Sequence, residues 1–349
     1  DISGLDDADI QAIDERVPKE LAPRPFRKKQ TDLSTTDKPT MFEVISTTII
    51  TNTLVDRFLE VLKELRTTDL AIHDLLVVTC YMYTCRVPLS MDVAIAFTRP
   101  YGISYTEILD KFKQLGGVVS NYEGVHADDR QSYYVPRSRA VADTVMDKLT
   151  GHELRRVLEN FHVNVSPTKI TRFDIFRRGA FDAKLTAKAF PNYKEGIGFY
   201  ESLFSKDRSP YLKQQAAIYL SRRSQHELAF ALIDQAVRES NSKNPTIRNT
   251  YAVIQFNANI NKPIDPTVVS TLDASMQLLA ECYNYDQRKA YHARVFADQA
   301  IKYSEKLPDA ERAREYLKLS QQWLKDEMKQ RPDDQRTKRE LRRVQVILS

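Results

Sequence analysis

The stretch GGVVSNYEGVHADDRQSYYVPRSRAVADTVMDKL, residues 116–149, interrupts a chain in which apolar residues otherwise recur at helical spacing. Two short runs rich in β-branched and aromatic residues, VVSNY and QSYYV, flank a polar connection that contains Gly124. A proline and two arginines then lead into a helical pattern, RAVADTVMDKL. The stretch therefore predicts one β-hairpin followed by a helix.

The residues before the hairpin show three helical patterns. Asp69 is the expected cap of LAIHDLLVVTCYMYT, 70–84, which is apolar nearly all round and predicts a buried central helix. Ser90 is the expected cap of the next helix, and Ser104 begins a third that stops at a Gly-Gly pair. Three helices, a two-stranded wing and a closing helix, in that order, predict a winged-helix domain over 68–150.

The first 67 residues have less pattern. Residues 1–40 contain a short helical stretch, LDDADIQAIDERV, with acidic residues in its first turn, and then a polar linker with four prolines. Residues 41–67 predict a helical region, because apolar residues share one helical face there: Leu54, Val55, Phe58, Leu59, Leu62 and Leu65.

Residues 151–349 predict further helices in pairs. Small residues are needed where two helices cross closely, and larger apolar residues fill the space between crossings. Such positions recur at the spacing of tetratricopeptide-type helical hairpins, namely Ala217, Leu220, Ala229, Ile233, Ala236, Ala293, Ala300, Ala313 and Leu317. The polar stretch RPDDQRTKRELRRVQVIL then predicts a capping helix, so we expect a tetratricopeptide-like α-solenoid over 151–349.

Composition agrees with a mainly α fold. Only nine of 349 residues are glycine, well below the usual ~7 %, whereas barrels, sandwiches and phosphate-binding loops need glycine. Three cysteines are too few for a disulfide framework, so we expect buried reduced thiols and a cytoplasmic protein. No apolar window of ~18 residues occurs, so no membrane partner is expected.

Sequence motifs for catalysis were not found. The chain lacks G-x-x-x-x-G-K-[ST], H-E-x-x-H and G-x-S-x-G, and its six histidines have no metal-ligand spacing. We therefore expect no active site, metal or cofactor within this segment. The chain begins with Asp rather than Met, so we expect a piece of a longer protein, whose own enzymatic activity stays open.

The surfaces that a winged helix uses on DNA are not basic here. The predicted third helix, SYTEILDKFKQL, carries two acidic and two basic residues, and the hairpin tip over 122–130 carries three carboxylates against one arginine. Carboxylates facing phosphates repel them. The sequence therefore argues against a nucleic-acid partner at this domain.

Three stretches together resemble the C-terminal half of STAND NTPases, the signalling ATPases related to NACHT and NB-ARC proteins that include bacterial antiphage sensors. The segment from MFEVISTTIITNTLVDRFLEVLKEL to VPLSMDVAIAF is similar to the region that follows the ATPase core. YVPRSRAVADTVM resembles a strand followed by an Arg-His-x-x-Ile-Ala-Glu pattern on the last winged helix. FYESLFSKDRSPYLKQQAAIYLSRR resembles the first repeats behind it.

The resemblance assigns site residues one by one. Arg137 matches the arginine of the pattern, Ala142 the alanine and Asp143 the acidic residue, whereas Ser138 replaces the histidine. In this family the winged helix is held against the nucleotide at rest, often through that histidine. The resemblance thus implies that Arg137 and Arg139 lie close to a nucleotide or a neighbouring domain; the alternative is that they cap the wing.

The resemblance implies a regulatory and sensor segment. Its helical repeats would bind a trigger, most plausibly a protein, and would gate a nucleotide-binding domain of the same protein that lies outside this segment. ATP or ADP is then the cofactor of the full-length protein, which would form a homo-oligomer on activation, as in antiphage defence.

Two alternatives stay open. One is a winged-helix transcription regulator with a helical ligand-sensing domain, which a basic cluster formed by Arg155, Arg156, Arg177 and Arg178 would favour. The other is a helical scaffold subunit that does not switch.

Overall fold

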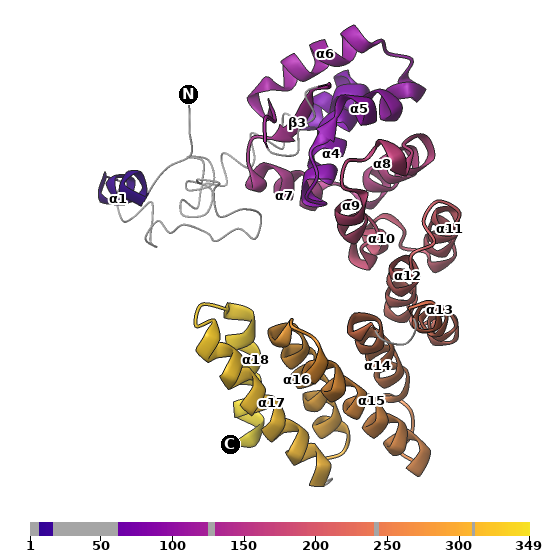
Figure 1. Ribbon diagram of the computed structural model, residues 1–349, viewed down its shortest axis with the longest axis vertical. Coiled ribbons are helices and arrows are strands. Elements are labelled where there is room, and N and C mark those ends of the chain that lie inside the picture. The colour runs from indigo at the N-terminus through magenta and orange to yellow at the C-terminus, as the bar shows by residue number, and fades with distance from the viewer. Residues whose placement is uncertain (1–6, 17–61, 125–129, 241–243, 309–310) are drawn as a thin grey trace. The chain divides into compact units, whose positions relative to one another are not determined.

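The computed structural model describes residues 7–16, 62–124, 130–240, 244–308 and 311–349 (Figure 1). The chain forms two compact units, Asp1–Pro191 and Asn192–Ser349. The predicted linker and most of the helical region predicted over 41–67 lie outside the described residues, apart from a helical stretch over 62–68. The predicted mainly α fold is confirmed: the described residues are helical except for short connections and one small sheet.

The N-terminal helical pattern forms α1 (Asp7–Arg16). The predicted three helices, hairpin and closing helix are also present, and a short strand and two 3-10 turns accompany them; we call 70–149 the hairpin module. Its elements are α4 (Leu70–Thr84), β1 (Leu89–Ser90), α5 (Met91–Thr98), η1 (Arg99–Tyr101), α6 (Tyr105–Gln114), η2 (Leu115–Gly117), β2 (Val119–Asn121), β3 (Tyr133–Pro136) and α7 (Arg139–Lys148).

The predicted hairpin is the pair β2–β3, which is antiparallel with Asn121 opposite Tyr134. The sequence did not predict β1, a two-residue strand that pairs with the other edge of β3 and gives the order β1-β3-β2. Only a helix cap at Ser90 was expected here, because a two-residue strand is too short to show an alternation of apolar and polar residues. The predicted helix cap is confirmed, since the Ser90 side chain accepts a hydrogen bond from the Val93 amide at 3.3 Å.

The helix α4 is the central element of the first unit, as predicted from its apolar sequence. All of its residues from Ala71 to Met82 are buried, apolar side chains on every face included. It packs against α7 and β3 of the hairpin module. The Phe112 ring of α6 stacks on Tyr134 of β3, with ring centroids 3.7 Å apart.

The first unit continues past the hairpin module through three more helices, so the sequence-based boundary at 151 lies inside it. These elements are α8 (Gly151–Asn164), η3 (Pro167–Lys169), α9 (Phe173–Ala180) and α10 (Ala183–Ala189). Tyr81 of α4 contacts Phe161 of α8 and Phe176 of α9 edge-on, and its hydroxyl lies 3.1 Å from Nε2 of His162. These buried rings join α4 to the helices that follow the hairpin module.

A buried carboxylate fastens α4 to α8. Asp74 is fully buried, and Arg156 of α8 donates to both of its oxygens at 2.6 and 3.1 Å. The Tyr101 hydroxyl also donates to Asp74, and the His73 ring nitrogen lies 2.8 Å away. Burial alone raises the pKa of Asp74, but the hydrogen bonds from His73, Arg156 and Tyr101 outweigh it and hold this pKa below its usual value.

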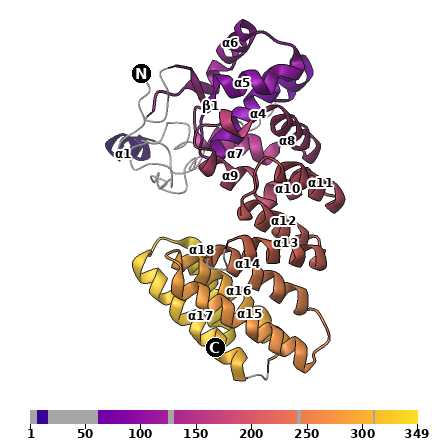
Figure 2. The ribbon, with the colours of Figure 1, turned by 45° about the vertical axis from the view of Figure 1, so that its right-hand side comes forward.

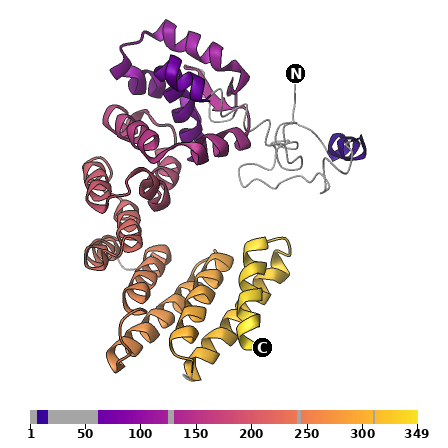
Figure 3. The ribbon, with the colours of Figure 1, turned by 180° about the vertical axis from the view of Figure 1, so that it is seen from behind.

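The second unit is built from helices that pack as successive antiparallel pairs. Its elements are α11 (Tyr193–Phe204), α12 (Pro210–Arg222), α13 (His226–Glu239), α14 (Pro245–Asn259), α15 (Pro266–Tyr285), α16 (Lys289–Lys306), α17 (Glu311–Gln330) and α18 (Gln335–Leu348). Each of the pairs α12–α13, α14–α15 and α16–α17 packs against the next helix along the chain. Figures 2 and 3 show α14 to α18 side by side in two views.

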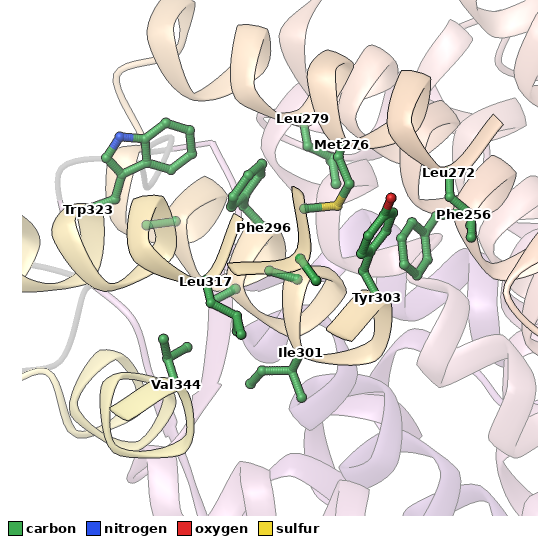
Figure 4. Packing of buried hydrophobic residues seen from close by; sticks show 14 of the residues in the cluster. Phe256, Leu272, Met276, Leu279, Phe296, Ile301, Tyr303, Leu317, Trp323 and Val344 are labelled. Atoms are coloured by element: carbon green, nitrogen blue, oxygen red, sulfur yellow. The ribbon is translucent and has the colours of Figure 1, made fainter. Parts of the chain in front are cut away.

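The predicted helix-crossing positions are all buried in the second unit. Each is at most 4 % exposed: Ala217, Leu220, Ala229, Ile233, Ala236, Ala293, Ala300, Ala313 and Leu317. Figure 4 shows the core between α14 and α18, where large side chains such as Phe296 and Trp323 point toward one another. The capping helix α18 is mostly polar; its Val344 is fully buried in this core, and Leu341 and Leu348 pack against it.

A pair of glycines in α11 tests the packing of the second unit. A methyl group added to Gly196 would lie 2.0 Å from Oη of Tyr219. The Tyr219 ring is buried, and its hydroxyl donates to the Asn192 carbonyl oxygen. Gly198 is exposed, and no atom lies within 4 Å of a methyl group added there. Gly198→Ala is expected to stabilise the helix by ~0.5–1 kcal/mol. Gly196→Ala is expected to destabilise the unit by ~1–3 kcal/mol through overpacking. Urea unfolding of both variants measures the difference, and equal stabilisation would contradict the packing described.

The Asp74 cluster predicts a dependence of stability on pH. Because the folded-state pKa of Asp74 is lowered, its contribution is fully present above the unfolded pKa of ~3.9 and is lost as the pH falls through the folded pKa. Asp74→Asn leaves Arg156 without its buried partner and is expected to cost ~3–5 kcal/mol at neutral pH. The free energy of unfolding of that variant should also decrease less on acidification, because the Asp74 carboxylate that would be protonated is absent.

Asp143→Asn is the matched control, since Asp143 pairs with Arg139 at 2.9 Å on an exposed helix surface. A surface pair of this kind contributes at most ~1 kcal/mol. Chemical unfolding between neutral and acidic pH, followed by circular dichroism, compares the three proteins. A similar effect of the two substitutions would show that Asp74 does not hold α4 to α8.

Candidate functional site: an arginine-lined groove

The first helix of each of the three pairs α12–α13, α14–α15 and α16–α17 and the capping helix α18 line a groove in the second unit. The groove measures about 610 Å³ and takes its lining from α12, α14, α16 and α18. These alternate helices contact one another directly, and the partner helices α13, α15 and α17 contribute no lining residue. The groove follows from the pairing of the helices, because in a stack of helical hairpins the first helices of successive pairs lie next to one another and form one common face.

The groove has a partly apolar floor. Ile218, Val253 and Val295 are half-buried there, and Ile254 is buried. Tyr291 is 41 % exposed, which makes it one of the large apolar residues that the second unit leaves open to solvent. An apolar surface with polar groups around it is typical of a ligand site.

The walls of the groove are basic. They carry six cationic side chains against two carboxylates, a formal excess of four positive charges: Arg222, Arg294, Lys302, Arg336, Arg339 and Arg343 against Asp298 and Glu340. The whole chain has an excess of only five over 349 residues. The formal charge excess of the groove lining is therefore nearly as large as that of the whole chain.

Ion pairs hold most of these side chains in place. Arg343 donates to Glu340 at 2.5 Å and lies 3.3 Å from Asp298, which also accepts from Lys302 at 2.7 Å. Burial alone lowers the pKa of the Arg343 guanidinium, but hydrogen bonds to Glu340 and Asp298 outweigh it, and the pKa is raised. Arg343 thus keeps its charge.

Arg294 is held by α18. It donates to the Asp334 carboxylate at 2.7 Å and to the buried Thr337 hydroxyl at 3.1 Å. Asp334 also caps α18, because it accepts from the amide of Thr337 at 3.2 Å. The charge of Arg294 is therefore partly compensated inside the fold.

Arg222 and Arg336 are different from the other arginines of the groove. Both side chains are exposed, and neither makes an ion pair or a side-chain hydrogen bond with any residue that the structure describes. They lie at the last residue of α12 and in the first turn of α18, the first and last helices that line the groove. The groove thus presents one uncommitted guanidinium on each of its outer helices.

Neutral polar groups lie between the two arginines. The Asn257 amide, half-buried on α14, has no hydrogen-bond partner among the described side chains. Gln299 is only 3 % exposed, and its side-chain oxygen accepts no hydrogen bond within the described part of the chain. An amide can donate and accept at once, which suits the backbone of an extended peptide.

The groove continues into an adjoining hollow of about 600 Å³. The two share Ser221, Asn257 and Lys302, and the hollow adds Lys306 and Glu305 of α16. The combined surface therefore extends over several helices, more than a compact small molecule needs.

A second cavity, of about 660 Å³, lies beside Asp273 of α15. Tyr303 and Tyr316 donate to one oxygen of Asp273 at 2.9 and 3.0 Å, and Arg312 forms an ion pair with the other. Burial raises the pKa of both tyrosines, and the hydrogen bonds to Asp273 raise it further. These groups satisfy one another and join α15 to α16 and α17, so we assign them a structural role.

The described residues offer little for covalent or metal chemistry. Burial raises the pKa of Cys282 to about 11 and that of Cys80 and Cys85 further still, which keeps these thiols protonated. Among the described residues, no group of three or more His, Cys, Asp or Glu side chains could hold a metal ion. No helix in the described ranges combines the length and the apolar character needed to span a bilayer.

The structure places the two arginines predicted from the hairpin stretch at the start of α7. Arg137 is exposed, and its backbone amide donates to the Val118 carbonyl oxygen at 2.9 Å. Arg139 pairs with Asp143 one turn later. Ser138 between them caps α7 through the Val141 amide at 3.2 Å. Their expected contact with a nucleotide or a neighbouring domain stays a prediction.

The four arginines proposed for DNA binding do not form a free basic cluster. Arg156 is committed to buried Asp74, and Arg155 pairs with Glu159 at 2.9 Å. Arg177 pairs with Asp174 at 2.8 Å. Arg178 also has an interaction within the fold.

The predicted DNA-reading helix, α6, is charge-neutral in the structure as well. Lys113 pairs with Asp110 at 2.9 Å, and Lys111 pairs with Asp69 at 2.5 Å. Such a surface offers no excess of positive charge to phosphates.

Comparisons with protein-family models, with curated proteins and with solved structures found no match for this chain.

Sequence reasoning missed the groove, although a signal for it was present. Arg336, Arg339 and Arg343 follow one another at i, i+3 and i+7, which places them on one face of α18. The stretch was interpreted as a solvated cap, because a polar helix at the end of a solenoid is usually one. That this face turns toward Arg222 and Arg294 depends on helix packing, which the sequence does not display.

The exposed, unpartnered arginines are expected to contribute nothing to folding. Arg222→Ala and Arg336→Ala should each change the free energy of unfolding by less than ~0.5 kcal/mol. Arg294→Ala should cost roughly 1 kcal/mol or more, because Asp334 and buried Thr337 lose their donor. Urea unfolding of the single variants measures this, and a large loss on removing Arg222 or Arg336 would assign those arginines to the fold instead of to a ligand.

Proposed function

We propose that this chain is the regulatory and sensor segment of a STAND-type signalling ATPase, in which the helical repeats bind a protein trigger. The groove is the observation that carries the proposal. It combines an apolar floor, a formal excess of four positive charges and two uncommitted guanidiniums. Concave, partly apolar surfaces on stacked helical hairpins are suited to extended protein ligands.

The hairpin module supports the gating part of the proposal. Its order of helices, its hairpin and its sheet order β1-β3-β2 agree with the winged helix that the resemblance implies. In the proposal this winged helix leans on a nucleotide-binding domain outside the segment, which holds ATP or ADP. Arg137 at the exposed start of α7 is available for that contact.

The mechanism requires two states with different affinities for the trigger. Binding in the groove would favour the state in which the winged helix is released from the nucleotide-binding domain. The released domains then form a homo-oligomer in the cytoplasm and switch on an effector, as in antiphage defence. The trigger can shift this equilibrium only by the difference between its affinities for the two states.

The charge pairs favour this reading over a DNA-binding transcription regulator. The α6 surface is neutral, and Arg155, Arg156 and Arg177 are held in ion pairs within the first unit. A scaffold subunit that does not switch would share the groove, and it differs in forming one complex whatever nucleotide is present.

The experiment measures ATP hydrolysis by the longer protein that contains this chain. Arg137→Glu should weaken docking of the winged helix and raise the basal hydrolysis or the oligomer fraction several-fold. Arg222→Glu/Arg336→Glu should leave the basal rate unchanged and abolish the response to the trigger. A longer protein without a nucleotide-binding domain, or an oligomeric state that is the same with ATP, ADP and neither, would refute the proposal.

A further inference from the structure

The groove also indicates what kind of segment it binds. Five of its six cationic side chains are arginines, and the guanidinium is the group that binds carboxylates in a bidentate, planar manner. Two of the arginines, Arg222 and Arg336, have no carboxylate partner among the described residues. The groove therefore presents carboxylate-binding groups that the described part of the chain leaves without a carboxylate.

The apolar floor favours a peptide over a nucleic acid. Val253, Val295 and the partly exposed Tyr291 line the groove together with the basic side chains and offer contact to aliphatic side chains. Asp298 and Glu340 lie on the same walls, and they would repel a continuous chain of phosphates. A segment in which carboxylates alternate with apolar side chains can avoid those two positions.

We propose that the groove binds an acidic, partly apolar segment of a partner protein. The carboxylates of this segment bind Arg222 and Arg336. Its apolar side chains contact Val253, Val295 and Tyr291. This inference rests on the proposed function, since it names the chemistry of the trigger that the repeats recognise. The Asn257 amide, which has no partner among the described side chains, hydrogen-bonds the backbone of the segment between the two anchors.

The test uses a fluorescein-labelled peptide in which glutamates and aspartates alternate with leucines, and measures its binding to the full chain by fluorescence anisotropy. Arg222→Glu/Arg336→Glu is expected to weaken binding at least tenfold, while the fold is unchanged because neither side chain has a partner among the residues that the structure describes. Binding should also fall as the salt concentration rises from ~50 to ~200 mM, since the contacts are exposed ion pairs.

The matched control is Arg314→Glu/Arg342→Glu. It changes the net charge by the same amount on α17 and α18, at exposed arginines that do not line the groove. The control should bind the peptide within about twofold of the unmodified chain. Equal weakening by both double variants would show a general charge effect and would overturn the inference.

Further arms separate the chemistries. A peptide with glutamine and asparagine in place of the acids, or with serine in place of the leucines, should bind more weakly than the parent peptide. Single-stranded DNA of similar length and charge should compete poorly. Competition by DNA at equal salt that matches or exceeds the acidic peptide would overturn the inference in favour of a nucleic-acid groove.

The two proposals fail in different ways. Loss of the trigger response in the groove variant, together with no binding of the acidic peptide, would refute the acidic segment and leave the sensor function standing. A normal trigger response in the same variant would refute the role of the groove in sensing, whatever the peptide does. Peptide binding that depends on Arg222 and Arg336, with a response that depends on them as well, supports both.

Discussion

The close crossing of helices at alanine positions is the constraint on which the second unit depends. Ala217, Ala229, Ala293 and Ala313 are at most 2 % exposed, and each lets the backbone of a neighbouring helix approach. Larger side chains such as Phe296 and Trp323 then fill the spaces between crossings. Each helical pair leaves one apolar face that only the next pair can cover, so the helices stack, and their first members come to share the surface that forms the groove.

Buried polar groups add specificity to this packing. Asp74 holds α4 to α8 through Arg156, and Asp273 holds α15 to α16 and α17 through Tyr303, Tyr316 and Arg312. In both clusters the carboxylate has its partners, as a buried charge requires. The groove differs in this respect, because Arg222 and Arg336 face solvent without a partner among the described residues. A charged side chain that is exposed to water and does not stabilise the fold is available to bind a ligand.

Much of the fold could be predicted from local patterns. The hairpin around Val119 and Tyr134 was detectable from its β-branched and aromatic runs, and the crossing positions of the repeats from the spacing of small residues. The strand β1 was not, since two residues carry no period. Asp74 was visible as one carboxylate in an apolar helix, but its partner Arg156 lies 82 residues away and no local pattern joins them.

The helical class, the position of the hairpin and the buried faces of the repeats could be predicted from the amino-acid sequence, because they depend on periodicity within single elements. The sequence also placed three arginines on one face of α18. Helix packing places this face across a groove from Arg222 on α12. It also brings carboxylates to Arg294 and Arg343, whereas Arg222 and Arg336 have no carboxylate partner among the described residues. The physical reason is that net local charge depends on distances between residues far apart in the chain, which are set by helix packing.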